Sequence, residues 1–200
     1  MRFLVWILIN TLYRIKETDL QKIPEEGPCV GVANHVSFVD ALIIGGTVRR
    51  PIRFVMYYKI FRIPLLNFIF RTARTIPIAG KKEDEAMMNR AFEEVAQASA
   101  AGDIVGIFPE GALTADGEIA AFKPGIEKII ERSPVPVVPL ALRGLWGSIF
   151  SRRDGALKRA RLPRRFWSKI ELVASDPVPA AEVKAAGLEA QVRALRGNQA

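Results

Sequence analysis

The sequence predicts a single α/β domain with a largely parallel central sheet flanked by helices, preceded by an interfacial amphipathic helix. Apolar runs typical of buried strands occur at residues 28–33, 52–57, 103–108 and 135–142. Segments with helical patterning lie between them, at residues 38–44, 59–71, 84–101 and 125–131. Strands that alternate with helices indicate a parallel sheet with its site at the carboxyl ends of the strands. The length of 200 residues suits one domain.

Local signals support the individual elements. Met88, Phe92 and Val95 keep helical spacing within 84–101, and Gly102 is a typical helix end. Pro124 suits the first turn of a helix. Three further elements are expected: a short strand end at 76–78, an edge strand at 167–174 and a weakly specified helix at 180–195.

The composition excludes several classes of protein. Half of the residues are hydrophobic, which excludes a disordered chain. Cys29 is the only cysteine, so no intrachain disulfide can form, and a reducing compartment is expected. Because Cys29 lies in a predicted strand, a small core residue is a simpler interpretation than a thiol nucleophile. One cysteine and one histidine cannot make a zinc site of the usual spacing, and no metal site is expected.

The N-terminal segment resembles a membrane-surface helix. Residues 2–16 form an apolar run with basic ends, too short to span a bilayer, which needs about 20 residues. No small-residue cleavage site follows it, and Trp6 and Tyr13 favour membrane interfaces. We therefore expect a membrane-interface helix over residues 1–17 and the main domain over 18–200. A helix packed on the domain or on another chain is the alternative.

A basic stretch indicates a polyanionic partner. It holds eight cationic residues against the single acid Asp154: Arg143, Arg152, Arg153, Lys158, Arg159, Arg161, Arg164 and Arg165. A solvated loop is the simpler alternative. Among polyanions we expect a membrane phospholipid surface and no nucleic acid, because only Trp146 and Phe150 interleave the charges and no nucleic-acid-binding motif is present. The expected location is the cytoplasmic face of the cell membrane, as a peripheral or monotopic protein.

His35, the only histidine, is the first candidate catalytic residue. It follows the strand-like run 28–33, and Asp40 comes five positions later. The two could not meet in one regular helix, but they could if His35 lies in the turn and Asp40 in the first helical turn. Ser37 followed three residues later by an acid resembles a capping box. Asp40 as a mere helix cap is therefore the alternative.

Three blocks in order resemble the glycerolipid acyltransferase family, which contains the 1-acylglycerol-3-phosphate acyltransferases. They are the H-x-x-x-x-D motif in the string NHVSFVD from Asn34 to Asp40, the string FPEG from Phe108 to Gly111, and the apolar string VPVVPL from Val135 to Leu140. The resemblance covers residues 18–143. It implies transfer of a fatty acyl group from acyl-CoA or acyl-carrier protein to the hydroxyl of a lysophospholipid, with no cofactor.

The resemblance also implies roles for individual residues. His35 would be the general base, because an imidazole with an ordinary pKa of about 6.5 can take the hydroxyl proton. Asp40 would fix its tautomer, and the substrate would supply the oxygen, without a covalent acyl-enzyme. Asn34, Glu110 and Gly111 would belong to the acceptor site, and the Gly111 N–H could face a phosphate or oxyanion.

The sequence departs from the family pattern where arginines usually bind phosphate. Ala112 follows Glu-Gly, and Ala79-Gly80 stands where many members carry Asp-Arg. The cations that could substitute are Lys81, Lys82, Lys123 and Arg74. The acceptor is expected to be 1-acylglycerol-3-phosphate, with reacylation of 2-acylglycerophosphoethanolamine as the alternative. A thioesterase using the same residues and a non-enzymatic basic membrane-binding module are the competing classes.

Overall fold

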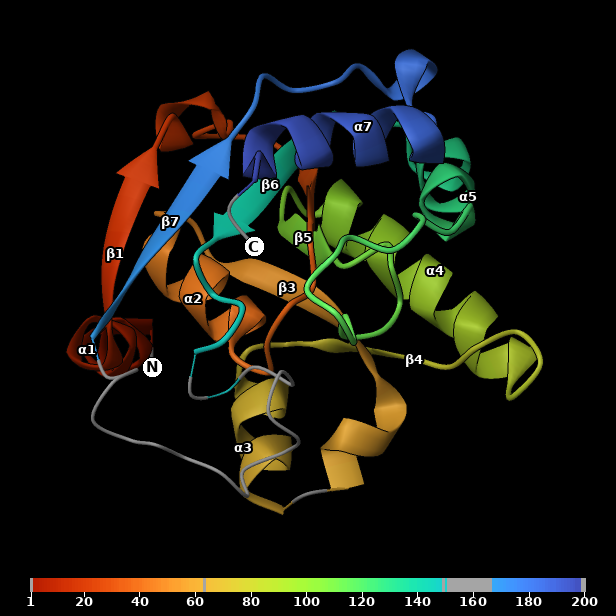
Figure 1. The fold of residues 1–200 in the computed structure, drawn as a ribbon. Coiled ribbons are helices and arrows are strands. Elements are labelled where there is room, and N and C mark those ends of the chain that lie inside the picture. The colour runs from red at the N-terminus through yellow and green to blue at the C-terminus, as the bar shows by residue number, and fades with distance from the viewer. Residues whose placement is uncertain (1, 63, 149, 151–166, 199–200) are drawn as a thin grey trace.

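The protein folds around a seven-stranded sheet, as seen in a computed structural model that describes residues 2–62, 64–148, 150 and 167–198 (Figure 1). The strand order is β1-β7-β6-β2-β5-β3-β4. The bounds are β1 Tyr13–Thr18, β2 Cys29–Ala33, β3 Ile52–Tyr57, β4 Ile76–Ile78, β5 Ile104–Ile107, β6 Val137–Arg143 and β7 Ser168–Ala174. Every pairing is parallel except that of β6 with β7, which confirms the predicted α/β class with a largely parallel sheet.

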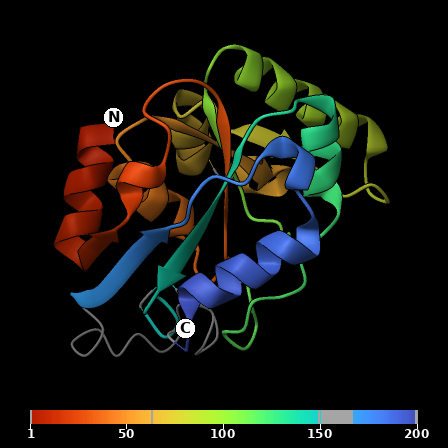
Figure 2. The ribbon, with the colours of Figure 1, turned by 90° about the horizontal axis from the view of Figure 1, so that it is seen from above.

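Helices cover both faces of the sheet. The α-helices are α1 Arg2–Leu12, α2 Asp40–Thr47, α3 Pro64–Thr72, α4 Glu85–Ala100, α5 Gly125–Arg132 and α7 Ala185–Arg196. Short 3-10 helices span Leu20–Lys22, Tyr58–Arg62 and Ala180–Glu182. Viewed from above, α1 and α2 lie on one side of the sheet, and α4, α5 and α7 lie on the other (Figure 2).

Alternation along β2 divides the core into two clusters. Val30 and Val32 point into the cluster shared with α4, α5 and α7. Cys29 and Ala33 point into the cluster shared with α1 and α2. The whole strand is buried, as expected for a central parallel strand. The residues that follow the carboxyl end of β2 therefore lie between two packed layers, which hold them in place.

The N-terminal segment differs from the predicted helix. The helix ends at Leu12, and Tyr13–Thr18 forms β1, paired with β7 in the register Tyr13↔Ser168 to Thr18↔Val173. The sheet therefore begins before the boundary expected at position 17, and the predicted edge strand β7 lies inside the sheet with β1 outside it. Helical periodicity alone could not reveal that β7 offers an open edge to this segment.

Two other differences are local. The helix expected over 59–71 is divided into the 3-10 helix Tyr58–Arg62 and α3, which begins at Pro64 as proline favours. Arg143 does not belong to a free basic surface, because its guanidinium bonds Glu171 and the carbonyl oxygen of Leu195. The other basic residues expected to bind anions, from Arg152 to Arg165, lie outside the described residues.

Candidate active site

The predicted histidine–aspartate pair lies at the carboxyl end of β2. His35 follows the strand in a turn, and Asp40 is the first residue of α2. His35 Nδ1 lies 2.8 Å from Asp40 Oδ2. The His35 side chain is 24% exposed, whereas Asp40 is fully buried. With Nδ1 on the carboxylate, Nε2 is the ring atom left to exchange a proton with a substrate.

The turn wraps its own backbone around the Asp40 carboxylate. Oδ2 also accepts the N–H groups of Val36 at 2.7 Å and Ser37 at 3.0 Å. Burial raises the pKa of Asp40, and the hydrogen bonds from His35, Ser37 and Val36 oppose that rise. Only half of the expected capping box forms. The acid accepts the Ser37 N–H, but Ser37 does not cap the helix, because the N-cap residue is Val39 and the Ser37 hydroxyl accepts the Val39 N–H.

Glu110 fastens this turn to the rest of the site. Its Oε1 accepts the His35 backbone N–H at 2.7 Å, and its Oε2 accepts the Ala120 N–H at 2.8 Å. The His35 carbonyl oxygen accepts the Thr114 N–H at 2.9 Å. Glu110 is 4% exposed, and burial raises its pKa while the two N–H groups lower it. Both oxygens of Glu110 thus bind backbone N–H groups of the site, and its contact with the acceptor stays a prediction.

Asn34 is also placed differently from the expectation. Its side chain is fully buried and pairs with the backbone of Leu142 on β6, donating to the carbonyl oxygen at 3.0 Å and accepting the N–H at 2.8 Å. Both ends of the amide are thus occupied by protein. Asn34 thus fixes the end of β2 against β6, and its role in binding substrate stays a prediction.

Phe108 is a site residue that the sequence interpretation missed. Its ring stacks on the His35 imidazole with centroids 4.2 Å apart and planes 15° apart, and on Phe54 with centroids 5.8 Å apart. It therefore fixes one face of the imidazole. The available signal was an aromatic residue at the end of a strand, directly before Pro109 and Glu110.

Gly111 and Lys123 form one side of the site. Gly111 has a φ of +70°, and its N–H donates to the Phe108 carbonyl oxygen at 3.0 Å, so this N–H is not free for an oxyanion as expected. The exposed Lys123 amine lies directly over Gly111, where a Cβ would collide with it. Lys123 makes no ion pair within the described part of the chain.

The structure does not bring Lys81 and Lys82 to His35. Both are exposed in the turn after β4, and Lys81 pairs with Glu85 at 3.4 Å. In the sheet β4 is three strands away from β2, which corresponds to about 14 Å at the usual strand spacing. Among the lysines expected to bind substrate, only Lys123 lies next to the turn formed by the FPEG string, where its amine is close to Gly111.

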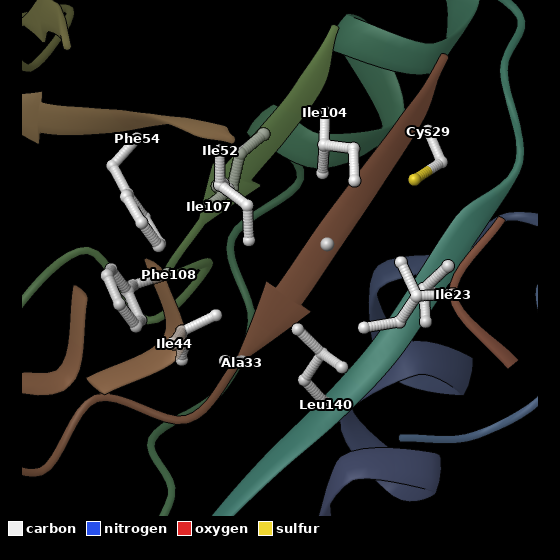
Figure 3. Close-up of a pocket in the computed structure, with 13 residues that line it drawn as sticks. Ile23, Cys29, Ala33, Ile44, Ile52, Phe54, Ile104, Ile107, Phe108 and Leu140 are labelled. Atoms are coloured by element: carbon white, nitrogen blue, oxygen red, sulfur yellow. The ribbon is translucent and has the colours of Figure 1, made fainter. Parts of the chain in front are cut away.

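An apolar cavity lies between β2 and α2, beneath this site (Figure 3). Its lining is Ile23, Cys29, Gly31, Ala33, Ile44, Ile52, Phe54, Ile104, Gly106, Ile107, Phe108, Val138 and Leu140. Phe108 thus both lines the cavity and stacks on His35. Burial raises the pKa of the Cys29 thiol to about 11, so the thiol is a protonated core group, as predicted.

The fold and the His35–Asp40 pair define an α/β protein with a histidine–carboxylate pair at the carboxyl ends of its parallel strands. The Acyltransferase family profile matches residues 14–143, and the chain belongs to this family. It is 29% identical over 144 residues to a chloroplastic 1-acyl-sn-glycerol-3-phosphate acyltransferase of Brassica napus, covering 70% of this chain and 41% of that protein. It is 31% identical over 138 residues to an N-acylphosphatidylethanolamine synthase of Arabidopsis thaliana, covering 62% of this chain and 47% of that protein.

A solved structure shares the fold. The 1-acyl-sn-glycerophosphate acyltransferase PlsC of Thermotoga maritima superposes with a TM-score of 0.68 at 22% identity, covering 92% of this chain and 71% of that one. The chain spans about half the length of the curated relatives it matches. In the described ranges, no helix is both long and apolar enough to cross a bilayer, and no three potential metal ligands cluster together.

Proposed function

We propose that this protein is an O-acyltransferase that moves a fatty acyl group from an acyl thioester to the hydroxyl of a lysophospholipid, with 1-acylglycerol-3-phosphate as the first candidate. The observation that carries this proposal is the His35–Asp40 pair. Its carboxylate is buried and its imidazole is part-exposed beside an apolar cavity, in a chain of the Acyltransferase family.

The reaction needs only a base and a positioned thioester. His35 Nε2 removes the proton of the acceptor hydroxyl as its oxygen attacks the thioester carbonyl carbon. Asp40 stabilises the resulting imidazolium through Nδ1–H. The carbon–sulfur bond then breaks, and the departing thiolate takes the proton from Nε2. The products are a diacyl lipid and a free thiol, and the imidazole returns to its neutral form.

An acyl-enzyme on serine is not part of the proposal. Ser37 is the serine next to the imidazole, but it is fully buried and its hydroxyl accepts the Val39 N–H. A serine nucleophile would need its hydroxyl at the imidazole nitrogen that takes the proton. Direct transfer between the two substrates fits this arrangement.

The cavity under Phe108 has a volume of about 10 Å³, room for one water molecule, so it could receive the acyl chain only if the side chains around it moved apart. Its apolar lining, shown in Figure 3, matches a hydrocarbon chain, and Phe108 links it to His35. Movement of Phe108 would connect the cavity to the reacting carbonyl. Acyl-CoA and acyl-carrier protein both supply such a chain, and both remain candidate donors.

Lys123 is the candidate contact for the acceptor phosphate. It lies over Gly111 on the turn that holds His35, and its ammonium is a point charge that can replace one of the missing arginines. Loss of the arginines expected at positions 79–80 and 112 also favours a second acceptor, 2-acylglycerophosphoethanolamine, whose phosphate carries less charge.

The exposed face of α1 is the candidate membrane contact. Phe3, Leu4, Trp6, Ile7 and Leu8 are 42–70% exposed, whereas Ile9 packs against Gly46 of α2. β1 starts at the edge of the sheet where β2 ends, because β1 runs with β7 and against β6. This places α1 at the same edge as His35, so binding to a lipid surface would bring the site to its acceptor.

An acceptor panel tests the proposal. Purified protein is incubated with acyl-CoA or acyl-carrier protein and with lysophospholipids that differ in head group, and diacyl products and free thiol are measured together. Thiol release matched by diacyl product is expected, fastest with 1-acylglycerol-3-phosphate. Thiol release without acylated lipid would identify a thioesterase, and neither product with any pair would favour a non-enzymatic membrane-binding module.

A further inference from the structure

The loop of residues 114–122, which follows the FPEG string, contacts the backbone of His35 at two points. The Thr114 N–H donates to the His35 carbonyl oxygen at 2.9 Å. The Ala120 N–H donates at 2.8 Å to Glu110 Oε2, and Oε1 of the same carboxylate accepts the His35 N–H at 2.7 Å. The position of the His35 backbone therefore depends on the position of this loop.

The loop has no regular structure of its own to hold it. Residues 111–123 form neither helix nor strand, so their backbone groups need partners from side chains. The Thr114 hydroxyl accepts the Gly117 N–H at 3.0 Å within the loop. Gly117 has a φ of +93° and lies so close to the Trp146 indole that a Cβ would collide with it. The remaining contacts of the loop come largely from α7.

Arg196, the last residue of α7, binds the first half of the loop. Its guanidinium donates to the Gly117 carbonyl oxygen at 2.8 Å and to the Glu118 carboxylate at 2.7 Å. Arg196 is only 7% exposed, and a buried charge is tolerated only where it is paired. Replacement of Arg196 would leave the carbonyl oxygen of the buried Gly117 without this donor.

Two further side chains of α7 bind the second half of the loop. Arg193 donates to the Ile119 carbonyl oxygen. Glu189 Oε2 accepts the Phe122 N–H at 3.0 Å, and Glu189 Oε1 pairs with Arg193 at 2.8 Å. Because Ala120 stands between Ile119 and Phe122 in the chain, its N–H is directed by contacts on both sides.

α7 is itself fixed to the rest of the domain. Leu188 and Val192 are fully buried in the same core cluster as Ile119 of the loop. At the end of the helix, Arg143 of β6 donates to the Leu195 carbonyl oxygen at 2.6 Å. α7 therefore connects the loop to the sheet, and through the loop it connects to the backbone of His35.

We propose that α7 is a positioning element of the active site and that Arg196 is its principal residue. By holding the loop, Arg196 keeps the Ala120 N–H on Glu110, and Glu110 in turn holds the His35 N–H. The helix acts through the loop and contacts no reacting group. It lies beyond residues 14–143, which the family profile matches. The effect on turnover rests on the proposed function, whereas the effect on the loop does not.

The variant Arg196→Met tests the proposal, because it removes both donors and keeps an apolar side chain of similar length. Hydrogen exchange at the Ala120 and His35 amides, measured by NMR, reports the loop directly. Both amides should exchange about tenfold faster, as expected for the loss of about one net hydrogen bond. At a temperature where the variant is fully folded, kcat should fall by about the same factor. Arg196→Lys keeps one charged donor and should restore part of both values.

Arg50→Met is the matched control. Its guanidinium also donates to backbone carbonyl oxygens, those of Pro24, Gly27 and Gly102, but none of them belongs to the loop. This variant should lower Tm and leave both the exchange at Ala120 and the kcat of the folded protein at wild-type values. Equally fast exchange at Ala120 in this control would reveal a general loss of stability and overturn the proposal.

Both readouts have to change in folded Arg196→Met. A lower Tm with wild-type exchange or wild-type kcat would reduce the role of Arg196 to stability and overturn the proposal. If that variant does not fold, Arg193→Met carries the same test, because its side chain is 40% exposed; a smaller increase is expected, and no increase would overturn the proposal. If the wild-type protein transfers no acyl group, faster exchange in the variant upholds the hold on the loop, and the proposed function is refuted.

Discussion

At the scale of single residues, two buried carboxylates, those of Asp40 and Glu110, hold the turn that carries His35. Asp40 binds the imidazole and the N–H groups of Val36 and Ser37. Glu110 binds the His35 N–H and ties it to Ala120. Burial raises the pKa of both acids, and the surrounding donors act against this rise. His35 is therefore held both by its ring and by its backbone, the kind of preorganisation that the proposed general base needs.

Glu110→Gln should lower both thermal stability and turnover while leaving the acceptor KM nearly unchanged. The amide oxygen can replace one carboxylate oxygen, but the NH₂ group cannot accept the second N–H, which costs about 1–3 kcal/mol. Melting curves and steady-state kinetics measure these effects. A raised KM for the acceptor at unchanged Tm would instead make Glu110 a substrate contact.

The sequence predicted the His35–Asp40 pair because both residues are close in the chain and the turn between them is local. The partners of Glu110 and Asn34 could not be predicted in this way. Their hydrogen bonds go to the backbone of Ala120 and Leu142, which only the packing of the sheet brings near. A sequence predicts that polar side chains such as these are exposed, whereas in the structure they are buried and form hydrogen bonds with backbone N–H and C=O groups.

At the scale of elements, Glu171 joins the outer strands of the sheet. Its carboxylate bonds Lys16 and Thr18 of β1 and Arg143 of β6. These contacts, of which the hydrogen bond from Lys16 has the largest effect, lower the pKa of Glu171 to about 2. β1 is thus held on β7 by the ion pair between Lys16 and Glu171 as well as by the backbone hydrogen bonds between the two strands. Lys16 and Thr18 lie 155 and 153 residues from Glu171 in the chain, which is why the strand at 13–18 could not be distinguished from a continuing helix.

Glu171→Gln should lower the free energy of unfolding at neutral pH by about 1–2 kcal/mol, a modest value because Lys16 is largely exposed. A depressed folded-state pKa stabilises the protein above the ordinary value of 4.5, and this stabilisation is lost as the pH falls towards about 2. The difference between variant and wild type should therefore shrink over that range. Urea melts from pH 7 to pH 2.5 test this, and a difference independent of pH would contradict the ion-pair account.

The outer face of α1 should bind lipid. Replacing Leu4, Trp6 and Leu8 with Gln should weaken the partition to liposomes and leave Tm almost unchanged, because these side chains are 48–67% exposed. Ile9→Ala is the matched control, since this 2% exposed residue packs on α2 and its loss should lower Tm without weakening lipid binding of the folded protein. Unchanged partition of the triple variant would show that the face binds another partner.

At the scale of the whole molecule, the sheet order places the site and the cavity around one central strand. β2 carries His35 at its carboxyl end and turns Cys29, Gly31 and Ala33 toward the cavity. Alternating strands and helices predicted this parallel core, because the pattern is repeated along the chain. The cavity was not predictable, since it depends on how side chains from several elements pack against each other.

If the acyl chain enters by widening this cavity of about 10 Å³, Gly31→Ala should shorten the preferred acyl chain. The added methyl group lies 3.3 Å from a Leu140 methyl group, so it fits with a small adjustment and narrows the cavity. The ratio of kcat/KM for long and short acyl donors should fall while Tm changes little. An unaltered ratio would place the acyl chain elsewhere.

The rate of acyl transfer by His35→Ala tests the central claim most directly. No other histidine can replace the base. A general base typically contributes about 10²–10⁴-fold, so diacyl product should form at least about a hundredfold more slowly in a protein with a near-wild-type melting curve. Retention of more than about a tenth of the wild-type rate by the folded variant would contradict the general-base role of His35.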